Sequence, residues 1–432
     1  MHLTDAVQPG SKGRMYMYTL MRKRANVICL LGFWLLGHPL QAEEPDRGTP
    51  WQIHIIDDSS RGADGVKLYD IDGDGLLDLT TGWEEGGITR IYRNPGPDKV
   101  KATWPALTVG KTPQVEDAAW IDLEHKGTCR AVVSCSEGKT RSVFVHWTPE
   151  DKPFENTWEQ AVIPASKDRM MWMFAIPAKL SQDASGGEVL VAAGKGPGAE
   201  IGWFECTGEP RDLSSYQWHP LAPAGWIMSL YAVDMDGDGD QDLLTTDRKG
   251  KHRGCRWLEN PGSDSSKGKP WQNHWVGGQD REVMFAHLAD LDQDGLQDIL
   301  VVSRAPDEVH WYRRLDQSGL KWDHRVIPYP QNTGGGKGVA VGDLDRDGQL
   351  DLVLSCEHAA PPRSGMFWLR GTRDGDQFNW EPREISGPQG IKYDRIELLD
   401  LDADGDLDVL CCEERHKKRG LGLFWYENPG QK

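Results

Sequence analysis

Residues 70–78 read DIDGDGLLD, and stretches of the same pattern recur at residues 234–242, 290–298, 343–351 and 400–408. Each copy has Asp at its first, third, fifth and ninth positions and Gly at its sixth. Around the first copy, runs typical of short strands lie at 66–69, 77–82, 88–93 and 104–109, separated by turn residues. The acidic stretch is therefore expected to join the first and second strands of a four-stranded unit.

Two series of aromatic residues indicate that this unit occurs seven times. One series lies in the third strand of each unit, at intervals of 54 to 57 residues: Tyr92, Trp147, Trp203, Trp257, Trp311, Trp368 and Trp425. A second series opens a strand-like run in each unit: Trp51, Trp104, Trp158, Trp218, Trp271, Trp322 and Trp380. Seven antiparallel four-stranded units of about 56 residues predict an all-β, seven-bladed β-propeller over residues 43–432.

The order of the strands predicts how the ring closes. The sequence ends shortly after the seventh third strand, which leaves the last blade without a fourth strand of its own. The first Trp-led run, residues 51–56, has no blade before it. We expect this N-terminal strand to pair into blade seven, because that pairing removes a free sheet edge and holds the two ends of the propeller together.

The five acidic stretches carry a ligand set suited to calcium. Four carboxylates within nine residues repel one another without a cation, and with a backbone carbonyl they supply the six to eight hard oxygens that Ca²⁺ prefers. An EF-hand is not expected, because position twelve lacks Glu and strand-like runs flank each stretch. About five mainly structural Ca²⁺ ions are predicted, on Asp70, Asp72, Asp74, Asp78, Asp234, Asp236, Asp238, Asp242, Asp290, Asp292, Asp294, Asp298, Asp343, Asp345, Asp347, Asp351, Asp400, Asp402, Asp404 and Asp408.

Two units depart from this pattern. Blade three offers Asp183 and Glu188 alone. Blade two has two acidic and two basic side chains at the ligand positions, and the basic pair is expected to take the place of a metal ion by pairing with the acids. These four residues are Asp122, Glu124, Lys126 and Arg130. No bound ion is predicted in either blade.

The five Asp motifs and the blade period make the sequence similar to the FG-GAP/VCBS repeat family over about residues 51–430. That resemblance implies the seven-bladed fold and the calcium loops, and relatives in the family include the integrin α-chain heads. The Phe-Gly-Gly-Ala-Pro string is absent, so the resemblance is to the bacterial exported branch. The family includes adhesive, scaffolding and lyase-associated members, and the resemblance therefore does not fix a function.

Residues 1–42 are expected to be a leader and export signal, with residues 1–20 upstream of a true start at Met21. Arg22 to Arg24 form a charged segment, and residues 25–37 form an apolar run too short to span a membrane. The mature chain is expected to be a monomer without a membrane span, in the periplasm or at the cell surface. A net charge of −18 argues against binding of nucleic acid.

Recognition is expected on the face opposite the acidic stretches, where loops between the second and third strands gather many of the basic residues. The hypothesis is an anionic polysaccharide or another surface ligand, held by basic groups with sugar rings stacked on Trp side chains. The candidate residues are Trp83, Arg169, Lys195, Trp226, Arg248 and Arg395. The histidines that follow the outer Trp residues, His54, His219, His274 and His324, are expected to be structural.

Motifs for a Ser nucleophile, a zinc protease or a phosphate-binding loop are absent. The leading hypothesis is therefore a binding module rather than an enzyme. One alternative is a polysaccharide lyase acting on uronic-acid glycans, for which His358 and Tyr393 are weak acid–base candidates. A second alternative is a protein-adhesion or assembly scaffold.

Overall fold

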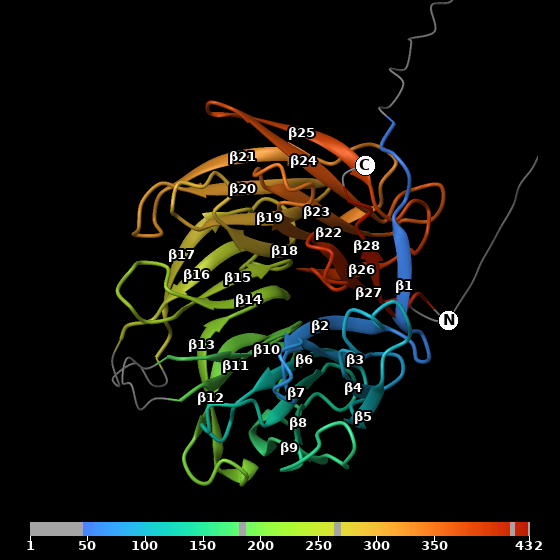
Figure 1. The fold of residues 1–432 in the computed structure, drawn as a ribbon. Coiled ribbons are helices and arrows are strands. Elements are labelled where there is room, and N and C mark those ends of the chain that lie inside the picture. Colours follow the sequence, from blue (N-terminus) through green and yellow to red (C-terminus); the bar gives the residue numbers. More distant parts are fainter. Residues whose placement is uncertain (1–45, 181–186, 263–268, 415–419, 431–432) are drawn as a thin grey trace, which may run out of the picture. The chain divides into compact units, whose positions relative to one another are not determined.

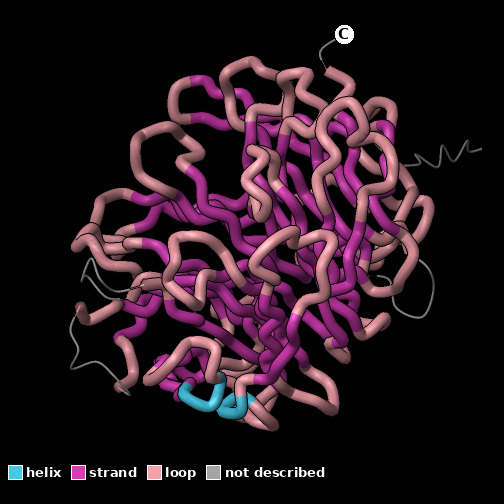
Figure 2. Tube along the Cα trace, turned by 60° about the horizontal axis from the view of Figure 1, so that its bottom comes forward, coloured by secondary structure: helices cyan, strands magenta, loops and turns pink. Residues whose placement is uncertain are grey.

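The computed structural model describes residues 46–180, 187–262, 269–414 and 420–430. In these ranges the only helices are two single 3-10 turns, η1 (Pro164–Ser166) and η2 (Leu213–Ser215), and nearly all other regular structure is strand (Figure 2). No helix among the described residues is long and apolar enough to cross a membrane. The predicted leader and export signal at 1–42 lies outside these ranges.

The strands form seven four-stranded antiparallel sheets, here called blades 1 to 7. Blade 1 comprises β2 (Ala63–Tyr69), β3 (Asp78–Trp83), β4 (Ile88–Tyr92) and β5 (Ala106–Lys111). Blade 2 comprises β6 (Val115–Ile121), β7 (Ala131–Ser136), β8 (Val143–Trp147) and β9 (Glu159–Val162). Blade 3 comprises β10 (Met171–Ala178), β11 (Val189–Lys195), β12 (Glu200–Cys206) and β13 (Tyr216–Pro223). Blades 4 and 5 comprise β14 (Ile227–Val233), β15 (Asp242–Asp247), β16 (Gly254–Glu259) and β17 (Gln272–Gly277); and β18 (Glu282–Ala289), β19 (Asp298–Arg304), β20 (Glu308–Arg314) and β21 (Trp322–Pro328). Blades 6 and 7 comprise β22 (Gly335–Gly342), β23 (Asp351–Glu357), β24 (Met366–Asp374) and β25 (Gln377–Glu384); and β26 (Tyr393–Leu399), β27 (Asp408–Glu413), β28 (Leu423–Glu427) and β1 (Gln52–Asp57).

The first strands of the blades line the middle of a closed ring. Each contacts the first strand of the next blade, from β2 to β6 and onward to β26, and β26 in turn contacts β2 (Figure 1). The predicted seven-bladed, all-β propeller is therefore confirmed. The apolar core lies between the faces of neighbouring blades: one cluster joins Ile56, Leu410 and Trp425 of blade 7 to Val66 and Leu79 of blade 1.

The N-terminal strand closes the ring as predicted. β1 pairs antiparallel with β28, with Gln52 opposite Glu427 and His54 opposite Trp425 (Figure 1). Just before β1, the amide of Trp51 donates a hydrogen bond to the carbonyl of Ile385 in blade 6 (2.8 Å). The first strand therefore supplies the outer edge of blade 7 and also ties that blade to its neighbour.

The strand register corrects one detail of the aromatic series. In four blades the Trp of the third strand lies opposite the residue two places after the ninth Asp of the acidic loop, as Trp311 lies opposite Leu300. These four are Trp257, Trp311, Trp368 and Trp425. In blade 1, Ile91 takes that place and Tyr92 lies one residue further on. Trp147 is displaced in the same way in blade 2, opposite Ala131. Successive strand side chains point to opposite faces, so these two aromatics pack on the other face of their blades.

Candidate functional site

The five acidic stretches, hereafter the Asp loops, join the first and second strands of blades 1, 4, 5, 6 and 7. In every Asp loop the Oδ2 atom of the first Asp accepts a hydrogen bond from the amide of the sixth-position Gly, at 2.8 to 3.1 Å. Gly suits this position because its φ is positive, between 86° and 96°, where side chains are strained. The loop is therefore folded around the carboxylate of its first residue.

The ninth Asp of each loop acts as an internal anchor. Its Oδ2 accepts the amide of the second loop residue at 2.8 to 3.2 Å. Its Oδ1 accepts an amide of the third strand or of the residue that follows closely after it, at 2.7 to 2.9 Å. Both oxygens of this carboxylate therefore bind the protein, although each keeps a second lone pair.

The Asp loops fit a hard divalent cation by geometry. Carboxylate oxygens lie within 4.8 Å of one another among the first, third and ninth Asp of the blade 1 and blade 4 loops, and among the first, third and fifth Asp of the blade 5 loop. The Oδ1 atoms of Asp72, Asp292, Asp402 and Asp406 are buried without a hydrogen-bond partner. Burial, with the neighbouring carboxylates, raises the pKa of the ninth Asp to about 7 in four loops and to about 6 in the fifth. A cation among these oxygens would offset that cost.

In blade 2, basic side chains occupy the corresponding place. Glu124 pairs with Lys126 (3.0 Å), with Arg130 (3.9 Å) and with Arg211 of blade 3 (3.0 Å). Asp122 accepts the amides of Lys126 and Gly127 instead of a basic side chain. The expected pairing therefore holds for Glu124 but not for Asp122. Asp183 of blade 3 lies outside the described residues.

The opposite face of the ring holds a cavity of about 350 Å³, hereafter the axial pocket. Every blade contributes a residue from the beginning of its first strand, so the cavity lies on the ring axis, away from the Asp loops. Its lining includes Asp64, Glu116, Phe174, Met228, Phe285, Lys337 and Asp394 from the first strands, and Glu84, Glu137, Lys195, Trp226, Arg248, Glu357, His358, Lys392 and Glu414 from around them.

One side of the axial pocket is built around Lys337, which is 5% exposed. Its ammonium lies 3.0 Å from Asp394 Oδ1 and 2.8 Å from Glu414 Oε2. Burial alone would lower the pKa of Lys337, but the two carboxylates outweigh it and raise that pKa. Asp394 also accepts the amide of Gly65 (3.0 Å), and it is ionised because Lys337 outweighs the effect of burial and lowers its pKa.

Asp64 lies beside Lys337 and Asp394 in this part of the pocket. Burial and the charges of Glu414 and Asp394 raise its pKa well above the ordinary value, and its side chain hydrogen-bonds Asp394. Burial likewise raises the pKa of Glu116 and, to a lesser extent, of Glu84. The pocket is lined by seven carboxyl groups and four lysine or arginine side chains. Burial disfavours the charged form of three of these carboxyls, Asp64, Glu84 and Glu116.

The other side of the axial pocket gathers three of the predicted ligand-binding residues. The ring centroid of Trp226 lies 4.8 Å from Lys195 Nζ and 4.9 Å from Arg248 Cζ, with Lys249 Nζ at 4.6 Å. The indole Nε1 of Trp226 is buried without a hydrogen-bond partner. Lys195 pairs with Glu116 (3.2 Å) and Glu137.

The structure places the other predicted ligand residues elsewhere, which corrects the sequence-based hypothesis. Trp83 is fully buried between blades and donates its Nε1 hydrogen to Tyr92 Oη (2.9 Å), so it cannot stack on a ligand. Arg169 pairs with Glu200 at the rim (3.1 Å) and does not line the pocket. Arg395 lies further along the axis, where it donates to Tyr231 Oη (3.3 Å).

The two weak catalytic candidates also separate. His358 lines the axial pocket, its side chain is 75% exposed, and its Nε2 lies 3.4 Å from Glu357 Oε1. Tyr393 is buried in blade 7 and donates its hydroxyl hydrogen to the carbonyl of Gln389 (2.6 Å). Tyr393 is therefore not available as a base toward a ligand in the pocket.

Three charged residues of the axial pocket were not among the site residues predicted from the sequence: Asp64, Lys337 and Asp394. Their shared position in the repeat could have identified them. Each lies six residues before the first position of the following acidic loop, in the first strand of its blade. Glu116 takes the same place before Asp122. A charged residue recurring at one position of a buried strand in four blades would have indicated a charged ring around the axis.

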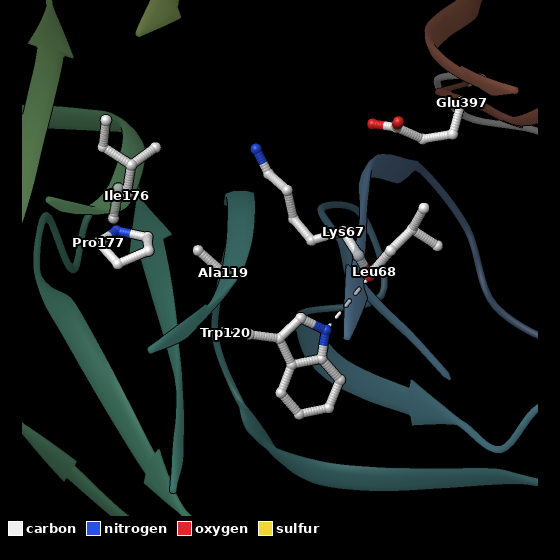
Figure 3. Close-up of a pocket in the computed structure, with 8 residues that line it drawn as sticks. Lys67, Leu68, Ala119, Trp120, Ile176, Pro177 and Glu397 are labelled. Atoms are coloured by element: carbon white, nitrogen blue, oxygen red, sulfur yellow. Dashed lines mark hydrogen bonds between the residues drawn. The ribbon is translucent and has the colours of Figure 1, made fainter. Parts of the chain in front are cut away.

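Further along the axis lies a second cavity, of about 310 Å³. Lys67 extends into it from β2, with Glu397 across the space and Trp120 beside it (Figure 3). The Lys67 ammonium lies 3.5 Å from Asp117 Oδ1. Burial, and then the charge of Arg395, lower the pKa of Lys67. The axis is thus polar beyond the axial pocket as well.

A family model described as FG-GAP-like repeat matches residues 255–354, which run from β16 into β23 and contain two Asp loops. No curated protein gives a match to this chain.

Among solved structures, the chain is similar to "Structure of Dos1 propeller" (9% identity, TM-score 0.49, covering 88% of this chain and 96% of the other). It is also similar to a chain of "Crystal structure of BBS1N in complex with ARL6DN, soaked with lead" (11% identity, TM-score 0.49, covering 88% of this chain and 98% of the other). A putative 6-phosphogluconolactonase from Bacteroides fragilis gives 12% identity and a TM-score of 0.45, with 82% and 88% covered. At TM-scores below 0.5 these likenesses say nothing about what this chain binds.

Proposed function

Because the chain is a β-propeller of FG-GAP-like repeats, we propose that it is an exported binding module that holds a segment of an anionic polysaccharide in the axial pocket. The observation that carries this proposal is the convergence of Lys195, Trp226 and Arg248 on one wall of that pocket. Propellers place ligands on the axis because all blades contribute side chains there.

The two sides of the pocket suit different parts of an acidic sugar. A carboxylate or sulfate group would pair with Arg248, whose side chain is 15% exposed and whose guanidinium also pairs with Glu282; a guanidinium suits planar anions because it offers two parallel hydrogen bonds. Sugar hydroxyls would donate to the carboxylates on the side of Asp394 and Glu414. Burial raises the pKa of Asp64 and Glu116 near the axis, which favours their uncharged forms beside an anion.

The test is retention in native gels that contain polygalacturonate or dextran sulfate, with neutral dextran as the reference. The variant Arg248→Glu should lose retention by the acidic gels and keep its mobility in neutral dextran. Arg169→Glu is the matched control, because Arg169 is also a basic group on this face but lies outside the pocket. Equal retention of both variants would remove the proposal.

A polysaccharide lyase is the second candidate, because His358 and Arg248 line the same cavity. Burial, with nearby Arg304 and Lys392, lowers the pKa of His358, so a neutral imidazole is present near pH 7. In β-elimination a base removes the proton beside the uronate carboxylate, a carbon–carbon double bond forms, and the glycosidic oxygen leaves with a proton. Unsaturated product that is lost in His358→Ala would favour this activity; binding without product would favour the binding module. A protein-adhesion scaffold is the third candidate, expected if neither glycan is retained.

We further propose that the Asp loops bind calcium and that the mature protein is exported. The support for calcium is the set of hard oxygens within 4.8 Å and the buried carboxylate oxygens that lack partners. The support for export is the charged and apolar composition of residues 21–42. Amino-terminal sequencing of the mature protein should give a start near Glu43, and a start at Met1 would contradict removal of an export signal.

A further inference from the structure

The five Asp loops differ in the charge of one residue in or just after the third strand, which lies beside each loop. The residue after the ninth Asp pairs with Tyr92, Leu258, Tyr312, Leu369 and Tyr426 in blades 1, 4, 5, 6 and 7. The next residue along the chain therefore occupies one equivalent place in all five blades. In blades 1, 5 and 6 it is arginine, and in blades 4 and 7 it is glutamate.

The arginines already neutralise part of their loops. Arg93 lies 2.8 Å from Asp72 and 3.5 Å from Asp74. Arg313 pairs with the third and fifth Asp of the blade 5 loop, the latter at 3.2 Å. Arg370 does the same in blade 6, with 2.7 Å to Asp347. A cation entering these loops must compete with a guanidinium for the same oxygens.

Blades 4 and 7 have the opposite composition. The equivalent residues are Glu259 and Glu427, and the seventh loop position is also acidic, Asp240 or Asp406, where the other loops have Leu or Gln. Each of these loops thus has six carboxylates where the other three have four and a guanidinium. Asp406 is 3% exposed, and its Oδ1 is buried without a hydrogen-bond partner.

In blade 7, nearby basic side chains offset part of the negative charge of the six carboxylates. Lys101 of blade 1 lies 2.9 Å from both Asp402 and Glu427, and Arg346 lies 4.0 Å from Asp406. In blade 4, Glu259 pairs with His274 (2.6 Å). The electrostatic field for a divalent cation is therefore stronger in blades 4 and 7 than in the three loops with arginine.

We infer that the Asp loops form two classes of divalent-cation site, with tight binding in blades 4 and 7 and weak binding in blades 1, 5 and 6. This inference rests on the proposed calcium binding. Propeller rigidity at low calcium then depends on two opposed positions of the ring, and the arginine loops fill as the concentration of Ca²⁺ rises. The difference in affinity is on the order of tenfold or more, since the charge beside the ion changes sign between the classes.

The test is calorimetric titration of EDTA-stripped full chain with Ca²⁺. Two tight sites followed by three weaker ones are expected. Glu259→Arg should remove one site from the tight class, and Arg313→Gln should move one site into it. Arg325→Gln, which removes a guanidinium from the outer strand of the same blade, is the control and should leave the titration unchanged.

The outcomes separate this inference from the calcium proposal. Five sites of equal affinity, unaffected by Glu259→Arg and Arg313→Gln, would overturn the two classes and leave calcium binding intact. An absence of heat and of any shift in melting temperature with Ca²⁺ would overturn both. Thermal melting of each variant in EDTA checks that it is folded, and the milder Glu427→Gln tests the same point in blade 7 if Glu259→Arg does not fold.

Discussion

The imidazole of His54, in the first strand, stacks on the indole of Trp425, in the last, with ring centroids 4.5 Å apart. His54 Nε2 also lies 2.7 Å from Glu427 Oε2. The same contact occurs inside continuous blades, between His219 and Trp203 (5.0 Å) and between His274 and Trp257 (4.2 Å). The N-terminal strand therefore reproduces, across the ends of the chain, a contact that other blades make between consecutive strands.

Closure of the ring should make a large contribution to stability. Trp51 is 9% exposed and packs between blades 6 and 7, so Trp51→Ala is expected to lower the free energy of unfolding by about 3–5 kcal/mol. Trp275→Ala, at a side chain 41% exposed on an outer strand, is the control and should cost about 1 kcal/mol or less. Denaturant unfolding measures both. Equal effects would show that the N-terminal strand does not close the ring in solution.

The ninth Asp of an acidic loop should matter even without metal. Asp351 accepts the amides of Leu344 (2.9 Å) and Gly371 (2.8 Å), and Asp351→Ala leaves both donors without a partner. We expect a loss of about 2–6 kcal/mol in EDTA, at about 1–3 kcal/mol for each of the two buried donors. Asp347→Ala, at an exposed fifth position, should change the melting temperature in EDTA little. Matching losses in the two variants would contradict the anchoring role.

Lys337 should be essential to the charged side of the axial pocket. Lys337→Met leaves Asp394 and Glu414 buried without their shared cation, which is expected to destabilise the fold by about 3–5 kcal/mol at pH 7. In the variant the folded-state pKa of these carboxyls rises above the unfolded value, so the penalty should shrink as the pH falls toward 4. Lys392→Met, which keeps Lys337, is the comparison. A penalty independent of pH would argue against the ion-pair network.

Buried histidine should make the protein sensitive to acid. Burial lowers the pKa of His146 to about 4, and its Nε2 lies 3.0 Å from Ser134 Oγ. The unfolded chain takes up this proton at a higher pH, so stability present above pH 6.5 should be lost as the pH falls from 6.5 toward 4, by about 1.4 kcal/mol per pH unit. His146→Gln should reduce the slope of unfolding free energy against pH in that window, whereas His125→Gln, at an exposed position, should not. Identical slopes would contradict the assignment.

The repeat made the fold predictable. An acidic turn and an outer Trp recur in phase, and counting strands was enough to place residues 51–56 in blade seven. The candidate site was predicted less well, because side-chain direction changes with each single residue of register. Trp83 and Trp226 look equally suitable in the sequence, but Trp83 ends a strand that is buried on both faces, whereas Trp226 lies in the connection before β14 and reaches the axis.

The charged residues on the axis were missed for a different reason. Lys337 lies inside a strand whose other residues are Gly, Val and Ala, which is ordinarily interpreted as core, whereas Asp394 lies in a strand that also carries Arg395 and Glu397. Only the ring brings them together, because each comes from a different blade. Arg395, next to Asp394, was chosen instead; it lies one strand position further on and so takes part in a different cavity.

The most direct test of the proposed function is calorimetric binding of a defined galacturonate trisaccharide to the calcium-loaded mature chain. The wild-type protein should bind it saturably at one site, and the double variant Lys195→Met/Arg248→Met should bind it at least tenfold more weakly. The melting temperature of the double variant in EDTA and in calcium checks that the propeller is intact. Unchanged affinity in a folded double variant, or no binding by the wild-type protein, would contradict recognition of an acidic glycan in the axial pocket.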